Sequence, residues 1–319
     1  MIDGTPEIDS TRNAERAPRG TARAPRSAER APRATNRATR SAEPAARTAA
    51  RHAWLPTPFL VLFNCVRISL CAAWTAAVGT FILAVIWPRY WYGLLRARLG
   101  RSDVLDRILE ANARFAGWVA QELWTRVLLA LTGMRLRVRE LIPIDWSRTH
   151  VMCANHASLF DILALIRIVP PPFRFVAKRE LVRWPIFGWT LRPAGQIIVD
   201  RADHTRALRS IAEAAVRNVR GQVIFFVEGT RTLTGELQEF KKGAFHFATQ
   251  NHLPVLPTAI RGSFTALAKR PWWRLQPGNE IEVLFCPPID PPAGAQPSAA
   301  VEALRARTRA VIASALHSV

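Results

Sequence analysis

Short runs rich in β-branched and aromatic residues alternate with helical stretches through the second half of the chain. The runs lie at Val151–Ala154, Phe173–Ala177, Gln196–Val199, Val223–Val227 and Ile281–Phe285, and the helical stretches at about 159–168, 204–219, 241–251 and 298–317. Strands that alternate with helices are typical of an α/β domain, because each crossover helix returns the chain to begin the next parallel strand. We therefore expect residues 134–319 to form a mainly parallel or mixed sheet flanked by helices.

A long apolar segment at about 59–87 precedes this domain. From Ile68 to Trp87 twenty residues pass without a charge, and a helix of that length spans about 30 Å, the thickness of the hydrocarbon core of a bilayer. Four aromatic side chains lie between Trp87 and Tyr92, as is typical of a membrane–water interface. The sequence therefore predicts a membrane-associated helical region over residues 54–133, embedded in the bilayer through its apolar segment.

The orientation of this segment stays open, because arginines lie on both sides of it. Arg47 and Arg51 precede the segment and Arg89 and Arg96 follow it, so the excess of positive charge on cytoplasmic loops selects neither direction. The same symmetry fits a hairpin that dips into one leaflet. The helical pattern over residues 103–133 is either the second arm of such a hairpin or a core helix of the domain.

Residues 1–53 differ in composition from the rest of the chain. They repeat an Ala-Pro-Arg theme and contain almost no large apolar side chain, so they cannot bury enough surface to offset the entropy of ordering. We expect a disordered tail, either a solvated one or an arm that binds nucleic acid or lipid. The whole chain has 44 Lys and Arg against 24 Asp and Glu, a net charge of +20, which favours anionic partners such as phosphorylated substrates, acidic lipids or nucleic acid.

The first candidate for chemistry is His156, which follows the run Val151–Ala154 and precedes Asp161 by five residues. Histidine accepts protons near neutral pH, and a neighbouring carboxylate can orient it. Five residues apart on one helix, the two side chains would point about 140° away from each other. They can meet only if His156 lies on the turn before a helix and Asp161 in its first turn, with Ser158 as the N-cap. Alternatively, Asp161 is only a capping carboxylate.

Polar residues also follow three other predicted strands. Glu228, Gly229, Thr230 and Arg231 come directly after Val223–Val227, Arg201 follows Gln196–Val199, and Lys178 follows Phe173–Ala177. In an open α/β sheet, ligands bind at the carboxyl edge of the strands. Glycine allows the backbone to approach a ligand closely, and arginine can hold a phosphate through two parallel hydrogen bonds. We expect these groups to form one substrate-binding edge with His156.

These motifs together resemble those of the lysophosphatidic acid acyltransferase (PlsC-like) family. NHASLFD resembles the family's NHxSxxD block, GQIIVDR its GxxFIDR block, FVEGTRT its FPEGTRS block, and the prolines and apolar residues of 253–257 its VPIxP block. The resemblance covers roughly residues 150–265. Two positions depart from the family pattern. Val199 stands where isoleucine is frequent, and Val227 where proline is usual, a change that could loosen the turn before Glu228.

The resemblance implies a function and a set of roles. His156 would act as general base on the hydroxyl of a lysophospholipid, with Asp161 orienting it, and the hydroxyl would attack an acyl thioester without a covalent enzyme intermediate. Residues 228–231 would bind the glycerol phosphate, with Arg201 and Lys178 as phosphate partners. The donor would be acyl-CoA or acyl carrier protein, and no metal or redox cofactor would be required. Such an enzyme would lie on the cytoplasmic (inner) membrane with its catalytic domain facing the cytoplasm.

Other functions compete with this one. A serine hydrolase would normally show a GxSxG turn, and the sequence has none. A membrane-anchored nucleic-acid-binding protein would explain the charge and the tail but gives no reason for the other motifs, and we expect no specific nucleic acid. Within the acyltransferases, glycerol 3-phosphate and lyso-ornithine lipid are alternative acceptors.

Overall fold

The computed structural model describes residues 57–200, 221–269, 274–294 and 296–318. All of them belong to one compact unit, Pro44–Val319. The predicted disordered tail (residues 1–53), the predicted helix at 204–219 and the candidate ligand Arg201 lie outside the described residues.

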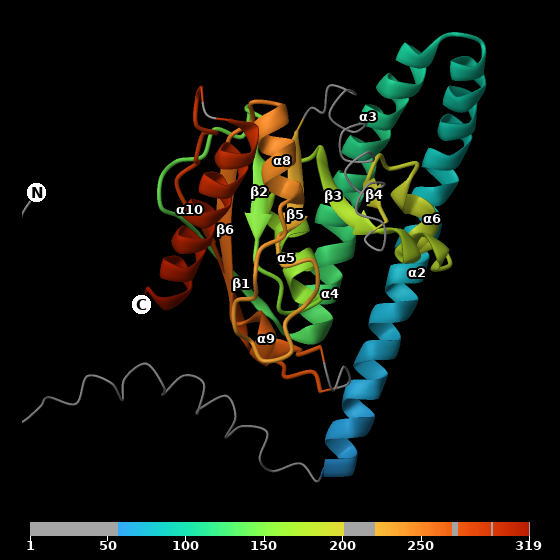
Figure 1. Ribbon diagram of the computed structural model, residues 1–319. Helices are drawn as coiled ribbons and strands as arrows, with labels where there is room; N and C mark the ends of the chain where they lie inside the picture. Colours follow the sequence, from blue (N-terminus) through green and yellow to red (C-terminus); the bar gives the residue numbers. More distant parts are fainter. Residues whose placement is uncertain (1–56, 201–220, 270–273, 295, 319) are drawn as a thin grey trace, which may run out of the picture. The chain divides into compact units, whose positions relative to one another are not determined.

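The described part of the domain is built around a seven-stranded mixed sheet in the order β1-β7-β6-β2-β5-β3-β4 (Figure 1). The strands are β1 (Arg135–Glu140), β2 (Val151–Ala154), β3 (Phe173–Lys178), β4 (Ile197–Val199), β5 (Gln222–Phe226), β6 (Val255–Arg261) and β7 (Glu280–Phe285). All neighbouring pairs are parallel except β6 and β7. The predicted α/β fold with a mainly parallel or mixed sheet is therefore confirmed, and so are the five predicted strands.

Two strands were missed by the sequence pattern. β1 alternates arginine with apolar residues and is exposed along most of its length, since it lies at the end of the sheet. β6 is interrupted in sequence by Pro257, which cannot donate a hydrogen bond, yet the strand pairs with β2 on one side and β7 on the other. Both depart from the uninterrupted apolar pattern by which a buried strand is identified.

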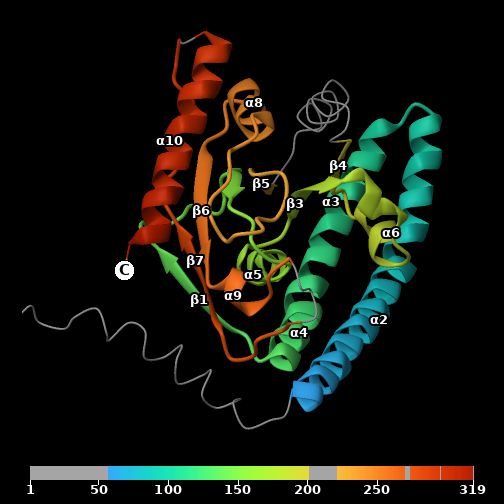
Figure 2. The ribbon, with the colours of Figure 1, turned by 60° about the horizontal axis from the view of Figure 1, so that its bottom comes forward.

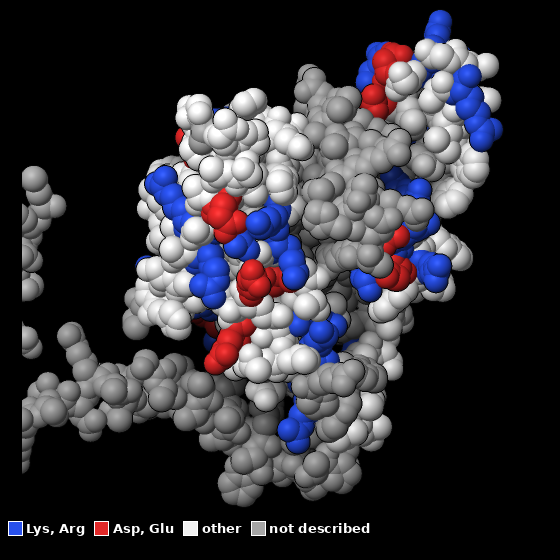
Figure 3. Space-filling model, viewed as in Figure 1, with Lys and Arg blue, Asp and Glu red and all other residues white. Residues whose placement is uncertain are grey.

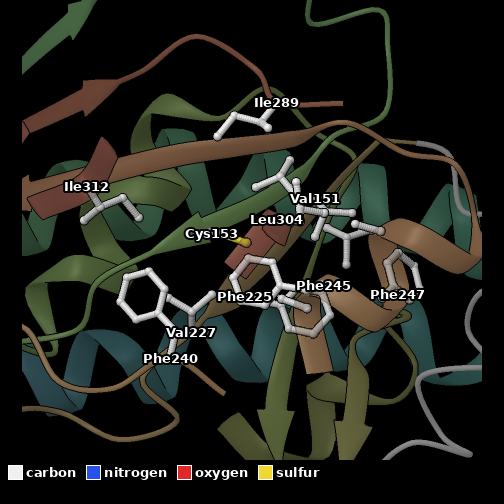
Figure 4. Packing of buried hydrophobic residues seen from close by; sticks show 14 of the residues in the cluster. Val151, Cys153, Phe225, Val227, Phe240, Phe245, Phe247, Ile289, Leu304 and Ile312 are labelled. Carbon is white, nitrogen blue, oxygen red and sulfur yellow. The ribbon is translucent and has the colours of Figure 1, made fainter. Parts of the chain in front are cut away.

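Helices cover both faces of the sheet. Val151 and Cys153 of β2 point to the face covered by α8 (Gly243–Gln250) and α10 (Pro297–His317), while Met152 and Ala154 point to the face covered by α4 (Thr125–Thr132), α5 (Phe160–Ile168) and α9 (Ser263–Ala266). This alternation follows from the two-residue repeat of a strand. Figure 4 shows the first of these cores, in which Phe225 of β5 lies among Phe245 and Phe247 of α8 and Leu304 of α10.

The N-terminal region forms two long helices beside the domain. α2 (Thr57–Arg98) contains 42 residues, and α3 (Ser102–Val119) returns along it (Figures 1 and 2). α3 continues through one π-helical turn (Ala120–Trp124) into α4. Between β3 and β4 lie a 3₁₀ turn (Arg179–Arg183) and α6 (Phe187–Leu191). The predicted apolar segment at 59–87 is the first three quarters of α2, which is long and apolar enough to cross a membrane.

One side of α2 is tied to the domain by side-chain hydrogen bonds. Asn64 Nδ2 donates to the carbonyl of Leu275 (3.1 Å), and Trp124 Nε1 donates to Thr75 Oγ1 (2.9 Å). Further along, Trp87 Nε1 donates to the carbonyl of Trp189 in α6 (3.3 Å). The other side of α2 carries exposed large apolar residues, among them Phe59, Leu62, Phe63, Leu70, Phe81 and Trp91. α2 is therefore packed against the domain on one side and leaves an apolar surface on the other.

Candidate active site

The turn after β2 brings His156 and Asp161 together as the sequence predicts. His156 lies on the turn before α5, and Asp161 is the second residue of the helix. His156 Nδ1 lies 2.8 Å from Asp161 Oδ2; the Asp161 side chain is fully buried, and 12% of the His156 side chain is exposed. The predicted meeting of the two groups is confirmed, whereas their catalytic roles stay a prediction.

Asp161 holds the turn as well as the imidazole. Its Oδ2 atom also accepts the backbone N–H groups of Ala157 (2.7 Å) and Ser158 (2.8 Å). Its other oxygen, Oδ1, is buried and has no hydrogen-bond partner in the described part of the chain. The capping role and the His-orienting role, which the sequence presents as alternatives, are thus carried by the same carboxylate oxygen.

The helix bounds place the N-cap of α5 at Leu159, one residue after the predicted Ser158, but the Ser158 side chain is the one that bonds to an N–H of the first turn. The Ser158 hydroxyl accepts the Phe160 N–H (3.3 Å) and donates to the carbonyl of Leu267 after α9 (2.7 Å). Ser158 therefore joins the histidine turn to the segment that follows β6.

Two contacts fix the orientation of the His156 ring, one on its face and one at Nδ1. The ring stacks on Phe226, the last residue of β5, with centroids 3.9 Å apart and an interplanar angle of 15°. Because Nδ1 is engaged by Asp161, Nε2 is the ring nitrogen left to accept a proton, and it has no hydrogen bond to any described residue. This is the geometry of a general base held in one orientation.

Glu228 contacts backbone groups. The residue is buried, its Oε1 accepts the N–H of His156 (2.7 Å), and its Oε2 accepts the N–H of Gln238 (3.1 Å). Burial raises the pKa of the Glu228 carboxyl above its usual value, and these hydrogen bonds oppose the rise. The N–H of Thr232 in turn donates to the carbonyl of His156 (2.9 Å). Glu228 and Thr232 therefore hold the backbone of His156 at its N–H and at its carbonyl.

The substitution of valine at position 227 does not loosen the Glu228–Arg231 loop. Val227 is buried, and its N–H donates to the carbonyl of Ala154 in β2 (3.1 Å), a bond that proline could not make. Its carbonyl accepts the N–H of Lys241 (2.7 Å). Gly229, next but one in the chain, has a φ of +77°, a backbone conformation that glycine adopts without strain.

Arg231 is half-buried close to the dyad. Burial lowers the pKa of its guanidinium from the usual value, while the nearby Asp161 carboxylate opposes that shift. Among the described residues, no hydrogen bond or ion pair engages the Arg231 side chain. Thr230 Oγ1 accepts a hydrogen bond from Lys269 Nζ (3.0 Å). A guanidinium whose hydrogen-bond donors are not engaged by any described residue, beside a candidate general base, is suited to an anionic substrate.

Lys178, also predicted to bind the substrate, lies apart from the dyad. Lys178 ends β3 at the same edge of the sheet, is exposed, and pairs with Glu180 (3.1 Å). Within the described ranges it makes no direct contact with the dyad.

No group of three or more His, Cys, Asp and Glu side chains in the described ranges is placed to hold a metal ion. The absence of a metal from the reaction stays an expectation.

Phe226 and Lys269 were missed by sequence reasoning. Phe226 lies inside the FVEGTRT block, so the position was available but its stacking partner was not. Lys269 belongs to no block, and it reaches Thr230 only through the path of the chain after β6. No sequence signal identified it.

Comparison with known proteins agrees with the motifs. Residues 135–261 match the family model described as "Acyltransferase". The 1-acyl-sn-glycerol-3-phosphate acyltransferase of Limnanthes alba is 30% identical over 237 residues, which are 73% of this chain and 76% of that protein. The protein of the same name from Cocos nucifera is 36% identical over 148 residues, 46% of this chain and 47% of that protein. The chain therefore spans about half the length of some relatives and three quarters of others.

A solved structure shares the fold. The crystal structure of the 1-acyl-sn-glycerophosphate acyltransferase PlsC from Thermotoga maritima superposes with a TM-score of 0.54 at 22% identity, covering 82% of this chain and 98% of that one. The motif blocks, the family model and the extended match to the Limnanthes alba protein lead to one conclusion: this chain belongs to the acyltransferase family that includes the 1-acyl-sn-glycerol-3-phosphate acyltransferases.

Proposed function

We propose that the protein transfers a fatty acyl group from acyl-CoA or acyl carrier protein to the free hydroxyl of 1-acyl-sn-glycerol 3-phosphate, giving phosphatidic acid. The observation that carries this proposal is the juxtaposition of the His156–Asp161 pair with the Arg231 guanidinium. The base, His156, accounts for the activation of a hydroxyl. The adjacent cation, Arg231, accounts for the selection of an acceptor that carries a phosphate.

In this proposal the acyl group passes directly from the donor to the acceptor, with no acyl-enzyme intermediate. His156 Nε2 takes the proton of the acceptor hydroxyl as the oxygen attacks the thioester carbonyl, and the buried Asp161 carboxylate stabilises the resulting imidazolium. The C–S bond then breaks, the ester C–O bond remains, and the thiolate recovers the proton from His156. General base catalysis of this kind contributes about 10² to 10⁴ in rate. Because both proton transfer and phosphate binding are assigned to side chains, the proposed reaction uses no metal or redox cofactor.

In this proposal the residues of the segment 228–231 have different roles. Arg231 binds the phosphate, with Arg201 and Lys178 as further candidates. Glu228 acts on the substrate indirectly, because both of its carboxylate oxygens accept backbone N–H groups that set the position of His156 and of the loop. Gly229 permits the turn, and the Thr230 hydroxyl accepts a hydrogen bond from Lys269.

We propose further that α2 lies along or dips into the cytoplasmic leaflet of the inner membrane, with the catalytic domain in the cytoplasm. Hydrogen bonds tie α2 to the domain from Asn64 to Trp87, a distance of about 35 Å along a helix. A helix that crossed the bilayer over this stretch would draw the attached domain residues into the hydrocarbon core. Reporter domains fused to the two ends of the chain test this: both should lie in the cytoplasm, and opposite locations would show that α2 spans.

A panel of candidate acceptors tests which lipid the protein acylates. Purified protein should be given a labelled acyl donor with lysophosphatidic acid, glycerol 3-phosphate, lyso-ornithine lipid or a phosphate-free 1-acylglycerol. Lysophosphatidic acid should give the highest kcat/KM. A preference for glycerol 3-phosphate or lyso-ornithine lipid would replace the acceptor in this proposal and leave the acyl-transfer chemistry.

The phosphate-binding assignment is tested by Arg231→Ala, Arg231→Lys and Arg201→Ala. A hydrogen bond to a charged group contributes about 1.5 to 3 kcal/mol, so loss of one arginine should lower kcat/KM for lysophosphatidic acid about ten- to a hundredfold. Kinetics for the acyl donor should change little. Lysine at position 231 should restore activity only in part, because it keeps the charge and loses the planar fork. Equal losses toward a phosphate-free acceptor would show a structural role.

A further inference from the structure

The segment that follows β6 contacts the histidine turn. It begins with α9, whose last residue, Ala266, accepts the N–H of Gln276 at its carbonyl (3.0 Å). The carbonyl of Leu267, directly after α9, accepts the hydroxyl of Ser158 from the histidine turn (2.7 Å). This segment is therefore joined to the turn that carries His156, although more than a hundred residues separate them.

Lys269, two residues further along, reaches the Glu228–Arg231 loop. Its Nζ atom donates to Thr230 Oγ1 (3.0 Å) and lies 3.3 Å from the carbonyl oxygen of Arg231. A lysine ammonium has three N–H donors, so one is left over. In the described ranges, no carboxylate pairs with Lys269. Among the described residues, the Lys269 ammonium group thus contacts the backbone of Arg231, has no carboxylate partner, and has one donor left for a ligand.

Two other lysines of the described chain pair with carboxylates. Lys242 pairs with Glu302 of α10 (3.2 Å), and Lys178 pairs with Glu180 (3.1 Å). Lys269 instead donates to the hydroxyl of Thr230 and the backbone carbonyl of Arg231, and in the described ranges no carboxylate balances its charge. A hydroxyl or amide side chain could also bond to Thr230, so loop closure alone does not call for a positive charge.

We propose that the Lys269 ammonium group binds the phosphate of the acceptor together with Arg231. The inference rests on the proposed function, and it adds a cation from a segment outside the motif blocks. A phosphate monoester carries close to two negative charges at neutral pH, which matches a pair of cations better than one. Arg231 supplies the planar fork, and Lys269 supplies a compact charge held in place by Thr230.

The test is binding of lysophosphatidic acid and of phosphate-free 1-acylglycerol to the full-length protein in detergent, measured by calorimetry. The variants are Lys269→Gln, Lys269→Arg and, as the matched control, Lys242→Gln. Lys269→Gln keeps a donor for Thr230 but loses the charge, so it should weaken lysophosphatidic acid binding about ten- to a hundredfold and leave 1-acylglycerol binding unchanged. Lys269→Arg should retain most of the affinity. Lys242→Gln should bind both ligands as the unaltered protein does.

Two results would overturn the assignment of Lys269. One is unchanged lysophosphatidic acid affinity in Lys269→Gln. The other is an equal loss for both ligands, which would show that the lysine only shapes the loop. Assaying the same samples for phosphatidic acid separates this inference from the proposed function. Protein that binds lysophosphatidic acid in a Lys269-dependent way but forms no product would support the phosphate site and refute the reaction. Product formation by Lys269→Gln with unchanged acceptor KM would refute the phosphate site alone.

Discussion

Replacing Asp161 by Asn separates the electrostatic role of this residue from its role in holding the turn. In the structure, Oδ2 accepts the imidazole N–H together with the N–H groups of Ala157 and Ser158. An asparagine must place its carbonyl oxygen there, because its NH₂ group would face two backbone donors. The amide oxygen can then still accept the Nδ1–H of His156. We therefore expect Asp161→Asn to keep the turn and the imidazole tautomer and to lose only the negative charge.

The size of the loss follows from this geometry. Two unit charges about 4 Å apart interact by about 4 kcal/mol at an effective dielectric constant near 20, and each 1.36 kcal/mol is a factor of ten in rate. Removing the charge beside the imidazolium should therefore lower kcat by about 10² to 10³. In Ser-His-Asp triads the same substitution leaves the wrong tautomer and costs about 10⁴. The two backbone amides predict a smaller loss here.

Asp161→Ala is the matched comparison. It leaves the Ala157 and Ser158 amides without an acceptor in a buried site, at about 1 to 3 kcal/mol each, so the free energy of unfolding should fall by about 2 to 6 kcal/mol. Denaturant unfolding and steady-state kinetics should be measured for both variants. Asp161→Asn should unfold close to the unaltered protein and lose kcat. Full activity in Asp161→Asn, or equal destabilisation by both substitutions, would refute the reasoning.

Three further expectations concern the surroundings of the dyad. Glu228→Ala should lower stability by about 1 to 3 kcal/mol for each backbone amide left without an acceptor, and denaturant titration checks this; an unchanged midpoint would contradict it. Phe226→Leu should lower kcat about two- to tenfold by removing the stacked support of His156, and an unchanged kcat would dismiss that role. Deleting residues 1–53 should leave specific activity in detergent intact; a loss confined to anionic vesicles would identify a lipid-binding arm.

The distribution of charge bears on the competing nucleic-acid function. On the face shown in Figure 3, Lys and Arg side chains lie among Asp and Glu side chains. Ion pairs such as Arg261–Glu282 and Arg305–Glu239 join opposite charges on the surface of the domain. On this face the described domain therefore lacks the continuous basic stripe that is expected of a nucleic-acid-binding surface.

Local patterns predicted the centre of the sheet because those strands are apolar on both faces. The run Val223–Val227 is buried throughout except for one partly exposed residue, Phe226, so its sequence is nearly uniform. β1 could not be identified in this way, since its arginines face solvent at the end of the sheet. The length of α2 was also underestimated, because the helix continues through Pro88 to Arg98 beyond the apolar segment.

The candidate site was predictable where one local rule fixes the geometry. The spacing of His156 and Asp161 allows contact only across a turn, and that contact is what the structure has. The role of Glu228 was not predictable, because its partners His156 and Gln238 are 72 and 10 residues away. The position of Lys269 depends on a 39-residue separation from Thr230. Contacts of this kind arise from the tertiary path of the chain and leave no periodic signal.

The most direct test of the account measures the product that the purified protein forms from lysophosphatidic acid and a labelled acyl donor. The same assay is made with His156→Ala, and thermal unfolding checks that the variant is folded. The account predicts labelled phosphatidic acid from the unaltered protein and a loss of about 10² to 10⁴ in rate for the variant, with no acylated protein seen by intact mass spectrometry when the acceptor is omitted. Phosphatidic acid formed by His156→Ala at an undiminished rate, or none formed by the unaltered protein, would contradict it.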